Sequence, residues 1–306
     1  MDLTLTEIRA FNATLQTGNY TRAADALGVS QPAITAQIRK LEGRFDHPLL
    51  ERVNKGVRAT ELGMKLYRIT RQYDDLDNSI DALMHPGLES GMHTVRVATA
   101  SPLIFMPLIA EFNRRFPGAT LKISTATTDE CKAKVLNREV DIGLFPMHDN
   151  ETNISRLAYY VHSLTAVVHP DHPLANERSL SVHQLKDESL IFYREQAFTQ
   201  QLANRTFARH NLHPTSHVIM ETRQDICEAV VHGLGIGFAL ASDIRQDNRF
   251  RSIPVEEATE QVTEHVVWLK TRSNLPGIKD FVELALERQC KSIGMTPSVA
   301  TPVTIE

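Results

Sequence analysis

The chain has 306 residues, of which 42% are hydrophobic and 23% are charged, and its formal net charge is -4. This composition is that of a globular protein with more than one domain, and it excludes fibrous and disordered classes. Its three cysteines, Cys131, Cys227 and Cys290, lie far apart without a Cys-x-x-Cys pair. They therefore build neither a disulfide framework nor a zinc ribbon, and they favour a reducing compartment.

The sequence predicts no secretory signal at the N-terminus and no membrane-spanning segment. The first residues lack a basic segment followed by an apolar one, so no signal peptide is expected. The longest uncharged stretch, 229–242, includes His232 and falls short of the about 18 apolar residues that span a membrane. We predict a cytoplasmic protein without a membrane segment.

Three short helices are predicted at the N-terminus. The first begins at a capping box formed by Thr4 and Glu7, has apolar residues at helical spacing and ends at Gly18. A second helix over 21–27 and a third that begins after Ser30 form a helix-turn-helix, whose later helix is shaped for a DNA major groove. The expected core of this unit consists of Ala23, Ala24, Leu27, Ile34, Ile38 and Leu41.

A wing and a long helix are predicted next. A turn with Gly56 lies between Arg52 and Arg58 and indicates two small strands. Downstream, an apolar residue recurs after four and three residues alternately, which predicts a coiled-coil helix that ends at Pro86. The stripe is Leu62, Leu66, Ile69, Tyr73, Leu76, Ile80 and Leu83. It is narrower than the apolar face of a helix lying on its own core, so we favour a dimer seam over that alternative.

From residue 94 onward, strands and helices alternate, which predicts two α/β lobes with parallel sheets. The expected strands are 95–98, 120–125, 141–145, 163–168, 190–193, 217–220, 235–240 and 262–269. Helices are expected at 102–116 and 128–137, after 181, 199 and 222 with comparable length, and at 275–289. The last helix is expected to return to the first lobe, so that the chain crosses between the lobes twice.

Residues 18–27, 30–42, 49–52 and 57–63 together resemble the DNA-binding domain of LysR-type transcriptional regulators. Further strings, at 141–143, 169–175 and 233–237, are similar to strings in the effector domain of that family. The resemblance therefore covers nearly the whole chain.

The resemblance implies an α/β protein with an α-rich N-terminal winged helix-turn-helix and a two-lobed effector domain similar to periplasmic binding proteins. The expected divisions are a DNA-binding domain at 1–59, a dimerising linker helix at 60–86, an effector domain at 92–291 and a disordered tail at 292–306. The implied partners are double-stranded operator DNA, a small-molecule effector, RNA polymerase and further copies of the chain in a homodimer or homotetramer.

The candidate DNA-binding residues are polar or basic and lie on the third helix and the wing. Amide, hydroxyl and cationic groups suit base edges and phosphates. The predicted set is Gln31, Pro32, Thr35, Arg39, Lys40, Arg52, Lys55 and Arg58. Residues 1–60 hold eight basic against six acidic residues, which is a weak excess of positive charge. The same charges are therefore also compatible with an ordinary solvated helix face that does not bind DNA.

The resemblance also implies a ligand site between the lobes, lined by the positions of Ser101 and Thr199. Hydroxyl residues after several predicted strands open helices, and helix N-termini favour anions, which predicts a small anion or zwitterion at Ser101 and Thr199. The alternative for each hydroxyl is a helix cap without a ligand role. The full predicted set is Ala100, Ser101, Thr127, Pro146, Tyr160, His162, Thr199 and Thr222.

Other chemistry has weak support. Nine of the 13 histidines fall between His148 and His232, but Pro214 after His213 interrupts any helix that would present two imidazoles together, so no metal site is predicted. Glycines at 233–237 follow a helix, the reverse of a dinucleotide fingerprint. No catalytic motif is present, and no cofactor is expected. An enzyme and a transport solute-binding component are the rival classes.

Overall fold

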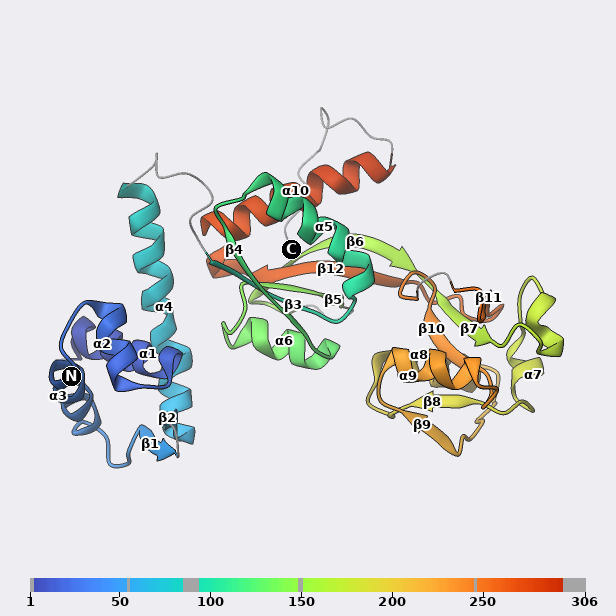
Figure 1. Ribbon diagram of the computed structural model, residues 1–306, viewed down its shortest axis with the longest axis horizontal. Coiled ribbons are helices and arrows are strands. Elements are labelled where there is room, and N and C mark those ends of the chain that lie inside the picture. Colours follow the sequence, from blue (N-terminus) through green and yellow to red (C-terminus); the bar gives the residue numbers. More distant parts are fainter. Residues whose placement is uncertain (1–2, 54–55, 85–93, 148–150, 245–246, 294–306) are drawn as a thin grey trace. The chain divides into compact units, whose positions relative to one another are not determined.

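The computed structural model describes residues 3–53, 56–84, 94–147, 151–244 and 247–293. The chain forms two compact units, Met1–Glu89 and Ser90–Glu306, each with its own hydrophobic core (Figure 1). The finer limits given above, 1–59, 60–86 and 92–291, remain predictions. Of the predicted tail 292–306, residues 292–293 belong to the last helix, and the rest lies outside the described residues.

The first unit begins with the three predicted helices, α1 (Leu5–Thr17), α2 (Tyr20–Leu27) and α3 (Gln31–Glu42). The capping box of Thr4 and Glu7 is confirmed, and Gly18 ends α1 with a positive φ of 65° that favours glycine. The predicted core residues pack together with Phe11, Leu49 and Leu50. Leu27 is the exception: it is 37% exposed, because α2 buries only Ala23 and Ala24.

The wing and the long helix follow as predicted. Strands β1 (Leu50–Val53) and β2 (Gly56–Ala59) pair antiparallel, and the backbone N–H of Val57 donates to the carbonyl of Gly18, 2.9 Å away. This bond ties the wing to the turn between α1 and α2. Helix α4 (Glu61–Met84) then runs through the apolar repeat.

The first lobe of the second unit has a five-stranded sheet in the order β4-β3-β5-β12-β6. The strands are β3 (Thr94–Thr99), β4 (Thr120–Thr125), β5 (Ile142–Pro146), β6 (Ile154–His162) and β12 (Val262–Leu269). Helices α5 (Pro102–Arg115) and α10 (Pro276–Ile293) pack on one face. Helix α6 (Thr128–Leu136) packs on the other, and a 3-10 turn (Lys270–Arg272) follows β12.

The second lobe is built around the sheet β10-β7-β11 and the pair β8-β9. The strands are β7 (Leu164–Val168), β8 (Ile191–Tyr193), β9 (Val218–Met220), β10 (Gly237–Leu240) and β11 (Arg251–Pro254). The helices are a 3-10 turn (Pro173–Asn176), α7 (Val182–Leu185), α8 (Phe198–Ala208) and α9 (Arg223–Val231). Helix α8 covers one face of the three-stranded sheet and α9 the other.

Three predictions about these lobes are corrected. The sheets are not wholly parallel: β3 lies parallel to β4 and β5, but β12 is antiparallel to β5 and β6, and β7 is antiparallel to both its neighbours. Strands β6 and β11 were not predicted. Helix α7 has only four residues instead of a length comparable to α8 and α9.

The two predicted crossings between the lobes are confirmed, and they explain the direction of β12. The chain leaves the first lobe along β6 and returns along β12, and these strands pair side by side with His162 opposite Val262 (Figure 1). Because β12 enters the sheet from the end at which β5 and β6 finish, it runs antiparallel to both. We call the paired ends of β6 and β12, at His162 and Val262, the hinge.

Candidate functional site

Helix α3 presents a polar face to solvent. Ile34, Ile38 and Leu41 are buried against the core, so the opposite side of α3 is left outside. There the Gln31 amide donates to the Thr35 hydroxyl, 3.4 Å away, one turn further on. Gln31, Pro32 and Arg39 are exposed and Thr35 is half-buried, so these four predicted DNA-binding residues share one accessible side of α3.

Lys40 is exposed as well, but it also pairs with a buried carboxylate. Its Nζ lies 2.9 Å from Oε1 of Glu7, which is fully buried at the start of α1, and Arg44 reaches the same oxygen at 3.1 Å. The hydrogen bond from Lys40, aided by Arg44, lowers the pKa of Glu7 to about 2. Lys40 is thus engaged in fastening α3 to α1, which reduces its availability for DNA.

In the wing, the guanidinium of Arg58 donates to Glu51 across the hairpin at 2.9 Å, whereas Arg52 on the neighbouring register position is exposed. Both arginines are thus exposed, and the charge of Arg58 is partly offset by its pair with Glu51. The predicted contact Lys55 lies outside the described residues.

One face of α4 is bonded to α1 by polar side chains. Thr70 donates from its hydroxyl to Asn12 at 2.6 Å, and both residues are buried. Asp74 accepts from Asn12 at 3.1 Å and from Gln16 at 2.9 Å. These contacts fix the middle of α4 to α1.

The apolar stripe of α4 divides into two parts. Leu62 and Leu66 pack on the core of the first unit. These two residues therefore match the alternative interpretation, in which the helix packs on its own chain. Exposure of the rest is high: Ile69 62%, Tyr73 43%, Leu76 56% and Ile80 44%. The side chain of Leu83 lies outside the described residues. Four large apolar side chains of the stripe therefore face solvent in the single chain.

Ser101 and His162 meet a residue that the sequence analysis did not identify, Glu264. The Ser101 hydroxyl donates to Oε1 of Glu264 at 2.7 Å, and Nε2 of His162 lies 3.2 Å from the same oxygen. All three side chains are buried at the hinge. Ser101 makes no capping bond to α5, and an anion at Ser101 would face this carboxylate, which argues against the predicted anion at this position.

The second lobe adds a carboxylate near the hinge. Tyr160 and Ser242 join their hydroxyls across the lobes at 2.9 Å. Asp243 follows directly, is buried and pairs with Arg223. Burial raises its pKa to about 7, against the opposing effect of Arg223. The sequence signal for Glu264 was a carboxylate inside a predicted strand that is mostly apolar, although Thr263 and His265 flank it. Asp243 had no such signal.

The remaining predicted hydroxyls behave mainly as caps. Thr127 and Thr222 each form a capping box, with Glu130 and Asp225 respectively. Thr199 does not open its helix, because the N-cap of α8 is Ala197. Ala100 is half-buried against the core under α6, and its N–H donates to a backbone carbonyl of β5.

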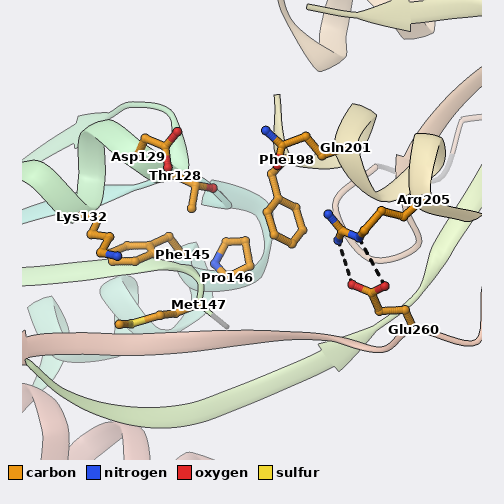
Figure 2. A pocket seen from close by; sticks show the side chains of 10 residues that line it. All are labelled: Thr128, Asp129, Lys132, Phe145, Pro146, Met147, Phe198, Gln201, Arg205 and Glu260. Atoms are coloured by element: carbon orange, nitrogen blue, oxygen red, sulfur yellow. Dashed lines mark hydrogen bonds and ion pairs between the residues drawn. The ribbon is translucent and has the colours of Figure 1, made fainter. Parts of the chain in front are cut away.

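A pocket of about 460 Å³ lies between the lobes (Figure 2). Its lining is Thr128, Asp129 and Lys132 of α6, Phe145, Pro146 and Met147 at the end of β5, Phe198, Gln201 and Arg205 of α8, and Glu260 before β12. Figure 2 shows the Phe198 ring pointing toward Pro146, with the Arg205 and Glu260 pair beside it. Of the predicted effector residues only Pro146 lines this pocket, while Thr127 and Thr199 are sequence neighbours of the lining residues Thr128 and Phe198.

The described part of the chain offers no group of three or more His, Cys, Asp or Glu side chains placed to hold a metal ion. Within the same residues, no helix has the length and apolar character needed to cross a membrane.

A winged helix-turn-helix joined through a long helix to a two-lobed domain with a pocket defines a ligand-responsive DNA-binding regulator. Residues 5–64 match the family model described as bacterial regulatory helix-turn-helix protein, lysR family, and residues 88–290 match the LysR substrate binding domain. The chain belongs to the LysR family: it is a LysR-type DNA-binding transcriptional regulator with an effector-binding domain.

Its relatives among known proteins are transcriptional regulators. The chain is 26% identical to the RuBisCO operon transcriptional regulator of Allochromatium vinosum over 296 residues, which cover 95% of this chain and 98% of that protein. It is 26% identical to the HTH-type transcriptional regulator CysL of Bacillus subtilis (strain 168) over 252 residues, 81% of this chain and 84% of the relative.

Solved structures share the fold. A full-length OxyR variant from Pseudomonas aeruginosa matches with a TM-score of 0.77 at 21% identity, covering 92% of this chain and 94% of that one. Full-length CbnR, solved as a complex with its target DNA, matches with a TM-score of 0.55 at 21% identity over 94% of this chain and 100% of that one.

Proposed function

We propose that this regulator binds operator DNA as a homodimer or higher oligomer and that a small molecule in the pocket between its lobes changes its operator binding or geometry. The observation that supports this most directly is the exposed polar face of α3 beside an accessible wing cation, on a core that buries only the opposite side of the helix. An exposed helix face with such groups suits a major groove.

In this proposal the contacts divide by role. Gln31 and Thr35 meet base edges, since amide and hydroxyl groups distinguish bases, and Pro32 provides an apolar contact at the start of α3. Arg39, Arg52 and Arg58 meet phosphates or the minor groove. Lys40 is a weaker candidate for a phosphate contact because it forms an ion pair with Glu7.

The exposed half of the α4 stripe supports assembly. A second copy of α4 would cover Ile69, Tyr73, Leu76 and Ile80, whose exposure on a lone helix is unfavourable. Two such pairs would give a tetramer. Paired helix-turn-helix units then meet two half-sites of one operator.

The effector acts by a shift of population between arrangements of the subunits. The pocket supports this role because both lobes line it, so its occupant has different contacts when the lobes move about the hinge. The oppositely charged side chains around it, Lys132 and Arg205 with Asp129 and Glu260, suit a polar ligand that carries an anionic or zwitterionic group. RNA polymerase is the further partner, and the cytoplasm is the place of action.

A gel shift tests the proposal against its rivals. The full chain is mixed with DNA from upstream of its own coding region and with a scrambled fragment of equal length. We expect a strong preference for the upstream fragment. Addition of a small-molecule metabolite extract should change the affinity for this fragment or the mobility of the complex. Equal affinity for both fragments contradicts the proposal, and ligand binding without any DNA binding supports a solute-binding component instead.

A further inference from the structure

Arg205 of the pocket already holds a carboxylate that belongs to the chain. Its Nη2 donates to Oε1 of Glu260 at 2.8 Å, and its Nε lies 3.5 Å from Oε2, the two dashed contacts of Figure 2. The hydrogen bond from Arg205 lowers the pKa of Glu260, so the carboxylate is ionised. Glu260 thus occupies the side of the guanidinium fork that a carboxylate ligand would take.

Glu260 also has a second cation available. Nη2 of Arg209, one turn along α8, lies 2.9 Å from Oε2 of Glu260. If a ligand takes Arg205, Glu260 keeps its pair with Arg209 and no buried charge is stranded. The exchange therefore costs little, because both guanidinium groups are about half exposed and each pair is a modest one.

The other residues that line the pocket indicate the size and the apolar character of such a ligand. Phe198 is the half-buried apolar side chain next to Arg205, with the buried Pro146 behind it, and the buried Phe145 and Met147 line the far side of the pocket. A volume of about 460 Å³ suits a small molecule. The chemistry is that of a small carboxylate with a compact apolar body.

We propose that Glu260 is an internal competitor of the effector: a small carboxylate binds Arg205 by displacing Glu260 toward Arg209. This inference rests on the proposed function, which places the effector in this pocket. Glu260 lies in the connector 255–261, which leads directly into β12 and to Glu264 at the hinge. Displacement of Glu260 therefore acts on the strand that joins the lobes.

Calorimetric titration of the full-length protein tests the competition with two pairs of probes matched in shape, propionate with propionamide and phenylacetate with phenylacetamide. Glu260→Gln removes the competitor, and we expect it to bind the carboxylates roughly three- to fivefold more tightly than the wild type. Arg209→Gln leaves Glu260 with Arg205 alone, and we expect carboxylate binding to weaken by a similar factor. The amides report on folding, and their affinities should stay unchanged in both variants.

Two results overturn the proposal: equal changes for carboxylates and amides, which indicate a structural role of Glu260, and no carboxylate binding in any variant. The second leaves the regulator function standing if operator DNA is still bound. If the opposite shifts of the two variants are seen but the wild type prefers no operator, the competition stands and the proposed function fails.

Discussion

Replacement of Leu76 by lysine tests the assignment of the exposed α4 face. Leu76 is 56% exposed on the single chain. Full burial of a leucine contributes about 2 to 3 kcal/mol, so covering the exposed part in a dimer contributes about 1.5 kcal/mol from each protomer. Leu76→Lys removes this from both copies, about 3 kcal/mol, and places two like charges at the seam. We therefore expect the dissociation constant of the dimer to rise at least about 100-fold.

Light scattering at micromolar concentration measures the mass of the variant, and a gel shift measures its operator binding. Met64→Lys is the matched control, because Met64 lies on the same helix, is 39% exposed and is not part of the stripe. We expect monomers and lost operator binding for Leu76→Lys only. An unchanged oligomer mass of Leu76→Lys would refute the dimer seam.

Four further substitutions test the other sites. Gln31→Ala should weaken cognate operator binding by about 1 to 3 kcal/mol and random DNA little, whereas Arg52→Ala should weaken both and flatten the salt dependence, measured by fluorescence anisotropy at several salt concentrations. Gly63→Ala should lower the melting temperature and operator affinity together, because a Cβ at Gly63 would lie 1.9 Å from the carbonyl oxygen of Leu49. Asp243→Asn should change the pH dependence of urea unfolding: burial raises the pKa of Asp243 from 3.8 to about 7. Between about pH 4 and pH 7, the folded chain then holds a proton that the unfolded chain releases. The free energy of unfolding of the wild type therefore falls as the pH rises through this range, and this pH dependence should vanish in the variant.

Each of these expectations has a contrary result. An unchanged affinity and salt dependence of Arg52→Ala would remove its role as a backbone or minor-groove contact. Equal losses on cognate and random DNA for Gln31→Ala would remove its role in base readout. A normal melting temperature for Gly63→Ala would contradict the close approach of α4 to the segment before β1. Parallel pH profiles for Asp243→Asn and the wild type would mean that Asp243 is ionised in the folded chain throughout this range.

The elements of the helix-turn-helix, the long helix and most strands of the lobes were predictable because their signals are local. The Thr4 capping box, the end of α1 at Gly18 and the strands Thr120–Thr125 and Val262–Leu269 were placed correctly. Caps join residues within one turn, and apolar periodicity reflects which side of a single element is buried. The order of these elements was also sufficient for the family resemblance.

The tertiary structure alone decided which side chains meet. Ser101 and Glu264 are 163 residues apart, Arg205 and Glu260 are 55 apart, and no local pattern pairs them. The direction of β12 follows from its return through the hinge, and a period of two residues is the same for parallel and antiparallel strands. The sequence by itself thus determined most of the elements and the class of protein. Long-range packing decided which residues line the pocket, that Glu264 is buried at the hinge, and that Lys40 pairs with Glu7.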